Sequence, residues 1–212
     1  MDISYIYSMF KSYFKNPSLL FLLAGNLYCL WYYQHHPGGF VTVVWVYWFQ
    51  SIIIGLFNFI DLLTIKKFDG STLKLNDEPV TPANKGCMAW FFLVHFGGFH
   101  LGYLVFLFIQ FRITAIDTNF LLLAVLAFMA EAIVSFIRRK QQEKNTLINI
   151  GSLFFLPYLR IVPMHLMILL PAFLNLQPSI VFLVLKTIAD LLSFALYQHL
   201  FNKSRTDNTS LM

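Results

Sequence analysis

The chain has 212 residues, of which 58% are hydrophobic and only 12% are charged, and its formal net charge is +5. A soluble domain of this size carries about 25% charged residues. The composition therefore excludes an ordinary soluble globular domain and indicates an integral membrane protein.

Residues 1–16 contain several aromatic residues together with Lys11 and Lys15. They lack the basic start, apolar middle and small-residue cleavage site of a signal peptide. A short segment with aromatic and basic residues is typical of a helix that lies in the membrane interface. We therefore expect residues 1–16 to form an interfacial segment.

Six apolar runs follow, and a bilayer-spanning helix needs roughly 20 mostly apolar residues. Turn sequences such as QHHPGG and NLQPS separate the runs. Pro157 is expected to open the fifth helix, after an apolar stretch that lies along the membrane surface. The predicted spans are residues 17–34, 39–65, 88–111, 118–138, 157–175 and 178–201. The sequence thus predicts an all-α polytopic membrane protein, a single six-helix domain over residues 1–212 with a tail at 202–212.

The basic residues are distributed unevenly between the two sides of these spans. Twelve of the fifteen Lys and Arg residues fall on one side, and Arg112 alone falls on the other. Because cytoplasmic loops collect Lys and Arg, both termini and the tail are expected to be cytoplasmic. The positive charge then reflects topology and contact with anionic lipid. The lipid bilayer is the expected partner, no nucleic acid is expected, and the oligomeric state stays open.

The third predicted span contains two histidines on different helical faces. His95 shares its face with Gly98 and Gly102, a small-residue pair that lets another helix approach closely. His95 is therefore expected to point into the bundle. His100 lies five residues on, so the two imidazoles cannot hold one ion as an i, i+4 pair would.

The later spans add further ionisable residues. Glu131 is the one charge on a face of small residues, His165 lies within the fifth span, and Lys186 and Asp190 are spaced i, i+4, so they could pair. Counted from the cytoplasmic ends, the depths of His95, Glu131 and His165 are about 9–12 Å, and that of Asp190 is about 15 Å. Ionisable residues inside a span are costly unless paired or hydrated, so their convergence indicates a shared functional site.

Two imidazoles and two carboxylates are suitable ligands for Zn²⁺, Fe²⁺ or Mn²⁺ with one open position for water. We therefore expect His95, Glu131, His165 and Asp190 to form a divalent metal site in the cytoplasmic half of the bundle. Metal-bound hydroxide would attack a lipid-like ester or amide that enters from the bilayer. The candidate catalytic residues are Glu131, Asp190 and Lys186.

Two other functions stay open at this point. In a proton- or ion-coupled transporter, the same residues would form a relay, and Lys186 and Asp190 would be a switchable pair. In a b-type haem protein, His165 would face His95 or His100, which makes His100 a candidate cofactor ligand. Each residue also has a structural interpretation, as an interhelical hydrogen bond or a buried ion pair.

Four segments carry a resemblance to a known group of proteins: WVYWFQSIIIGLFNFIDLL, FFLVHFGGFHLGY, PYLRIVPMHL and LKTIADLL. They resemble a family of small polytopic prokaryotic membrane proteins of unknown function, and the resemblance covers most of the spans. It implies a plasma-membrane protein of a bacterium or archaeon. It implies no activity, so no catalytic residue follows from it.

Overall fold

The computed structural model describes residues 17–36, 38–144, 147–159, 161 and 180–209, without the side chains of 181, 182 and 197–209. Over these residues the chain is mostly helical, as the sequence predicts. The helices are α2 (Pro17–His35), α3 (Phe40–Thr64), α4 (Lys85–Gln110), α5 (Thr118–Glu143) and α7 (Ile180–Thr209), with a 3₁₀ turn η1 (Ile113–Ala115) and a shorter helix Ile150–Leu159.

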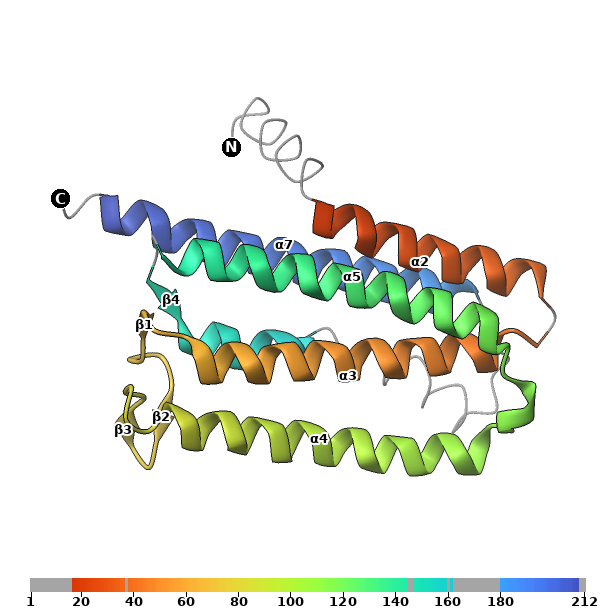
Figure 1. Cartoon of the computed structure of the whole chain (residues 1–212), viewed down its shortest axis with the longest axis horizontal. Helices are drawn as coiled ribbons and strands as arrows, with labels where there is room; N and C mark the ends of the chain where they lie inside the picture. Colours follow the sequence, from red (N-terminus) through yellow and green to blue (C-terminus); the bar gives the residue numbers. More distant parts are fainter. Residues whose placement is uncertain (1–16, 37, 145–146, 160, 162–179, 210–212) are drawn as a thin grey trace.

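The long helices lie side by side along the long axis of the molecule (Figure 1). Helix α3 packs between α4 and α5, and α2 packs against both α5 and α7. The helix Ile150–Leu159 packs against α4, where the ring of Phe92 lies 5.6 Å from that of Phe154 and 5.8 Å from that of Tyr158. The polar side chains between α2, α3, α5 and α7 are therefore enclosed by helices.

The helix ends follow from local chemistry. Pro17 stands at the first position of α2, where its missing N–H costs no hydrogen bond. Gly38 has φ +81° in the turn before α3, a conformation that favours glycine. The Asp117 side chain caps α5 by accepting hydrogen bonds from the backbone N–H groups of Asn119 and Phe120.

Four two-residue strands lie at the end of the molecule where α3 ends and α4 begins. Strands β2 (Lys74–Leu75) and β3 (Glu78–Pro79) form a hairpin, in which Asn76 and Asp77 both have positive φ, as a tight two-residue turn requires. Strand β1 (Phe68–Asp69) pairs in parallel with β4 (Ile148–Asn149). The all-α prediction missed these strands because two residues show no hydrophobic alternation.

Three predicted boundaries are wrong. Helix α5 continues to Glu143, five residues past the predicted end. Pro157 lies inside the helix Ile150–Leu159 and does not open a helix. Helix α7 continues through the predicted tail to Thr209, because residues 180–209 contain no glycine or proline to stop it. Residues 1–16 and most of the fifth predicted span lie outside the described residues.

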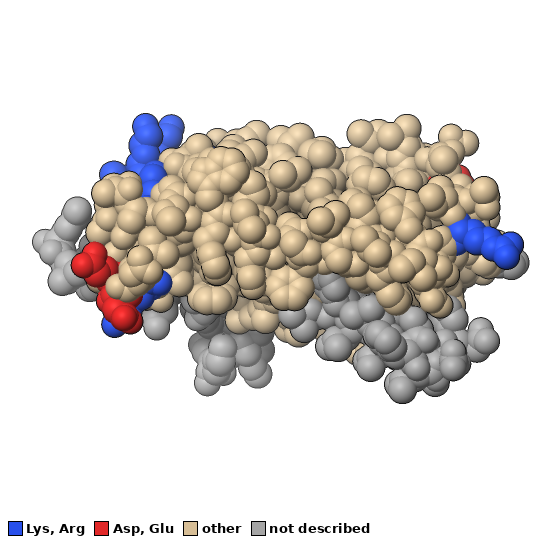
Figure 2. All heavy atoms as spheres, turned by 90° about the horizontal axis from the view of Figure 1, so that it is seen from below, with Lys and Arg blue, Asp and Glu red and all other residues tan. Residues whose placement is uncertain are grey.

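Three of the described helices, α3, α4 and α5, are long and apolar enough to cross a membrane. Each has 25 or 26 residues, which corresponds to about 38 Å at the helical rise per residue. A hydrocarbon core is about 30 Å thick. On the face seen in Figure 2, charged side chains lie near the two ends and uncharged residues cover the surface between them. This distribution fits a membrane protein.

Close packing between helices depends on two glycines. A Cβ atom on Gly25 would lie 2.7 Å from the Phe128 ring of α5, and one on Gly55 would clash with the Phe96 ring of α4. Around Gly98 and Gly102, by contrast, no atom of the described residues lies within 4 Å of such a Cβ. The predicted packing at Gly98 and Gly102 is therefore not present among these residues.

Candidate functional site

Lys186 and Asp190 form a buried ion pair on α7, as their spacing predicts. The Lys186 Nζ atom lies 2.5 Å from Asp190 Oδ2, and each residue is only 1% exposed. The Lys186 ammonium also lies 3.9 Å from the centre of the Tyr47 ring, within the range of a cation–π contact. Charges removed from water this completely need good compensation, and the surrounding side chains supply it.

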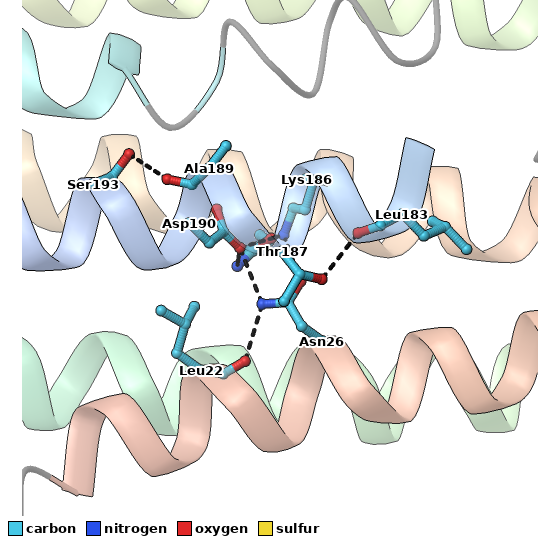
Figure 3. A network of polar contacts seen from close by, with 9 residues as sticks. Leu22, Asn26, Leu183, Lys186, Thr187, Ala189, Asp190 and Ser193 are labelled. Carbon is cyan, nitrogen blue, oxygen red and sulfur yellow. Dashed lines mark hydrogen bonds and ion pairs between the residues drawn. The ribbon is translucent and has the colours of Figure 1, made fainter. Parts of the chain in front are cut away.

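Two carboxamides bridge the two charges. Asn26 of α2 accepts from Lys186 Nζ at 3.1 Å and donates to Asp190 Oδ2 at 3.0 Å. Gln50 of α3 accepts from Lys186 Nζ at 2.5 Å and donates to Asp190 Oδ2 at 3.5 Å. Figure 3 shows Lys186 and Asp190 of α7 turned towards Asn26. The three N–H donors of the ammonium thus meet three oxygen acceptors from three helices.

Glu131 belongs to a second polar group, between α2 and α5. Its Oε1 atom accepts hydrogen bonds from Ser18 at 3.0 Å and from Ser135 at 2.9 Å, and the two serine hydroxyls also contact each other. Glu131 is 3% exposed. Ser18 and Asn26 are eight residues apart on one face of α2, so the two polar groups lie about 12 Å apart along that helix.

A cavity of about 80 Å³ opens beside this second group. Ser18, Glu131 and Ser193 in its lining are buried, and we call this part the inner end; Arg138 and Gln142 are half-buried, and we call their part the outer end. Apolar walls come from Ile54, Phe57, Ala132, Leu156, Pro157 and Phe194, and Asn58, Ser135 and Arg139 complete the lining. Ser193 lies three residues after Asp190 on α7, so the inner end of the cavity approaches the ion pair.

A cluster of charges lies past the outer end of the cavity. Asp61 of α3 pairs with Arg139 at 2.5 Å and with Lys140 at 3.3 Å, and Lys140 also contacts Glu143 at 3.0 Å. Glu143 accepts from the Lys66 backbone N–H at 2.5 Å. These contacts join α3 to α5 at the end of the molecule where the basic residues were expected to gather.

His95 and His100 lie in different surroundings. His95 is exposed and its Nδ1 atom lies 2.9 Å from the Tyr158 hydroxyl. His100 is the buried one, 2% exposed, with Nδ1 at 2.8 Å from the Phe96 carbonyl oxygen and Nε2 at 2.9 Å from Ser51 Oγ. The expectation that His95 points into the bundle is wrong, because no described residue packs against Gly98 and Gly102 to enclose that face.

The proposed ligands and catalytic residues therefore fall into separate groups. Asp190 and Lys186 lie in one, Glu131 in another, and His95 beside Tyr158. Among the described residues, no set of three or more His, Cys, Asp or Glu side chains could hold a metal ion. His165 lies outside them, so the metal site and the haem ligation that use it stay predictions. His100 already has a partner at each ring nitrogen.

Sequence reasoning missed the contribution of α2 to both polar groups. Ser18 and Asn26 are 1% exposed and contact Glu131 and the ion pair, respectively. A signal was present, because these two polar residues stand eight positions apart in an apolar run and so share one helical face. Gln50 and Ser51 of α3 contact Lys186 and His100, respectively, and neither contact was predicted.

Comparison with known proteins identifies a family for this chain, but that family has no known activity. The profile of a family of unknown function, DUF6498, matches residues 8–209 of the chain. No curated protein and no solved structure gives a match.

Proposed function

We propose that this chain, which belongs to the DUF6498 family of unknown function, is a proton- or ion-coupled transporter whose ion-exchanging centre is the Lys186–Asp190 pair. The observation that carries the proposal is the pair itself: two opposite charges, each 1% exposed, bridged by carboxamides from two other helices. Ionisable residues buried within a membrane helix bundle typically mark the path of an ion or proton.

The proposed exchange takes place at Asp190. A proton or small cation that reaches this carboxylate neutralises it and releases Lys186 from its ion pair. Asn26 and Gln50 each contact both charges, so they can continue to hydrogen-bond the ammonium while the carboxylate carries the ion. When the ion leaves, the pair forms again. The two states differ in the contacts of α7 with α2 and α3, which is how ion binding would be coupled to helix movement.

The cavity beside Glu131 is the proposed cytoplasmic entrance. It leads from Arg138 and Gln142 to Ser193, one turn from Asp190. We place it on the cytoplasmic side because Lys66, Arg139 and Lys140 lie at this end, and cytoplasmic ends collect basic residues. The proposed setting is the plasma membrane, with six spans and both termini in the cytoplasm.

The experiment measures proton movement in vesicles containing the purified protein. The vesicles hold a pH-sensitive dye and a mixture of soluble metabolites that supplies candidate substrates, and the external pH is lowered in one step. The wild-type protein should accelerate internal acidification over protein-free vesicles. Asp190→Asn removes the ion-binding charge and should reduce the rate to that of empty vesicles.

The matched control is Thr187→Ala on the same helix. Among the described residues, the Thr187 hydroxyl donates to the Leu183 carbonyl oxygen at 2.9 Å and does not contact the pair, so this variant should transport normally. Equal rates for the wild-type protein and for Asp190→Asn, both above those of empty vesicles, would refute a role for the pair in ion exchange.

A further inference from the structure

The outer part of the cavity contains the guanidinium group of Arg138, which has no counterion in the described part of the chain. Arg138 is half-buried and lines the cavity, and among the described residues it has no ion pair or hydrogen bond. Its neighbour Arg139 is paired with Asp61 and is already neutralised. A guanidinium presents five N–H donors in a planar fork that matches a carboxylate or phosphate group. The side chain of Arg138 is thus available to an anion in the cavity.

Asn58 supplies a second unused donor in the same cavity. Asn58 is 7% exposed, and its Nδ2 atom has no hydrogen-bond partner within the described part of the chain. Buried amide groups without a partner are costly and uncommon, so one that lines a cavity is a sign of a missing ligand group. Asn58 comes from α3 and Arg138 from α5, so the two donors face the cavity from different helices.

The charge of Glu131 decides where an anion can lie. Arg138 follows Glu131 by seven residues, so the two share one face of α5 about 10 Å apart. Glu131 would repel an anion at the inner end, whereas Arg138 attracts one at the outer end. Ile54, Phe57, Leu156 and Phe194 provide an apolar wall for the rest of the ligand.

We propose that this cavity is a binding site for an anionic amphiphile, whose phosphate or carboxylate group binds Arg138 and Asn58 and whose apolar chain contacts the Ile54, Phe57, Leu156 and Phe194 wall. The size of the cavity suits the charged group and the start of the chain. The inference concerns binding and does not depend on ion exchange at Lys186, so the two proposals can fail separately.

Calorimetric titration of the full chain in a neutral detergent tests this site with four probes: n-octyl phosphate, octanoate, inorganic phosphate and 1-octanol. We expect saturable binding of n-octyl phosphate and of octanoate, and no saturable binding of 1-octanol. Inorganic phosphate has the oxyanion without the apolar chain and should bind at least tenfold more weakly than n-octyl phosphate. A tenfold difference in Kd corresponds to about 1.4 kcal/mol of binding free energy. Equal affinity would assign the site to free phosphate.

The variants identify the residues. Arg138→Gln should weaken n-octyl phosphate binding about tenfold or more, because a hydrogen-bonded charge is lost. Asn58→Leu should weaken it less, and Glu131→Gln should leave it unchanged or strengthen it. Arg112→Gln, at the opposite end of the molecule, is the matched control and should bind as the wild type does.

Unchanged affinity in Arg138→Gln would overturn the proposal, and so would 1-octanol binding as tightly as n-octyl phosphate. If Arg138→Gln does not fold, Arg138→Lys provides the test, because it retains the charge and loses the planar fork. Arg138→Lys should bind n-octyl phosphate more weakly than the wild type does. The double variant Asn58→Leu with Arg138→Lys should bind it more weakly still. Wild-type affinity in Arg138→Lys and in that double variant would equally overturn the site.

Discussion

The Lys186–Asp190 pair gives the sharpest prediction at the scale of single residues. Lys186→Met leaves Asp190 as a buried charge without its ammonium, and Asp190→Leu leaves Lys186 without its carboxylate. Breaking a buried pair from one side typically costs about 3–5 kcal/mol. Each single variant should therefore lose much of its thermal stability, measured as the Tm of the detergent-solubilised protein.

The double variant Lys186→Met with Asp190→Leu should regain most of the lost Tm, because no buried charge remains. Thr187→Ala serves as the reference for changes on α7 that leave the pair intact. If the two single losses simply add in the double variant, the residues serve different partners and the pair is not a unit.

At the residue scale, the sequence predicted contacts within a helix better than contacts between helices. The i, i+4 spacing of Lys186 and Asp190 predicted their pairing, which is present. The bridging role of Asn26 depends on how α2 packs against α7, and no spacing within one helix contains that information. The same limit explains the histidines: the sequence places His95 and His100 on different faces, and only packing decides which face is buried.

At the scale of helices, Gly55 gives a prediction with an internal control. Gly55→Ala puts a Cβ into the Phe96 ring and should lower the stability by about 1–3 kcal/mol, the usual cost of overpacking. Gly98→Ala meets no described atom and should be neutral, or stabilising by up to about 1 kcal/mol through helix propensity. Thermal unfolding of both variants in one detergent measures the difference.

Phe96→Leu should recover part of the stability lost in Gly55→Ala, because the smaller side chain leaves room for the added methyl group. Equal destabilisation by Gly55→Ala and Gly98→Ala would contradict the contact between α3 and α4 described here.

Helix ends were predictable where glycine, proline or a capping residue marks them. Helix α3 was predicted at residues 39–65 and runs from Phe40 to Thr64, between Gly39 and a polar loop. The C-terminal end of α7 was predicted eight residues too early, because the apolar run ends near residue 201 and the helix continues past it. A polar sequence without glycine or proline can remain helical outside an apolar environment.

The orientation of the whole molecule in the membrane can be tested by cysteine labelling with a membrane-impermeant reagent. The native Cys87 is exposed and is first replaced by serine, whereas Cys29 is buried and stays. Single cysteines are then placed at exposed positions, Glu78 in β3 and Ala115 in η1. On intact cells, Ala115→Cys should react and Glu78→Cys should react only after permeabilisation, since the basic end is expected to be cytoplasmic.

Labelling of Glu78→Cys from outside would reverse the proposed orientation. The cavity beside Glu131 would then open to the external side, and the proposed direction of proton entry would be wrong.

At the scale of the whole molecule, the composition predicted a membrane protein, and the distribution of Lys and Arg predicted that charges gather at the ends of the helices. Three helices suited to crossing a membrane agree with the predicted class, and charged side chains lie near both ends on the face seen in Figure 2. Which end is cytoplasmic stays a prediction. Whether the polar residues share one site was not predictable, because depth along a helix axis gives one coordinate and lateral position needs two more. His95 and Asp190 were expected at similar depths, yet their observed contacts are with Tyr158 and Lys186.

The hydrogen bonds from Asn26 and Gln50 to the Lys186–Asp190 pair also have a consequence for biosynthesis. Asn26 leaves the ribosome 160 residues before Lys186, and Gln50 leaves 136 residues before it. At a synthesis rate of about 5–20 residues per second, Lys186 is made roughly 8–30 s after Asn26. During that interval α2 and α3 hold polar amides without the charges that they later bind. Helix α7 carries Lys186 and Asp190 in its N-terminal half, so it is a poor substrate for membrane insertion on its own. In the proposed six-span arrangement, insertion of α7 is therefore tied to its docking on α2 and α3, which are made earlier.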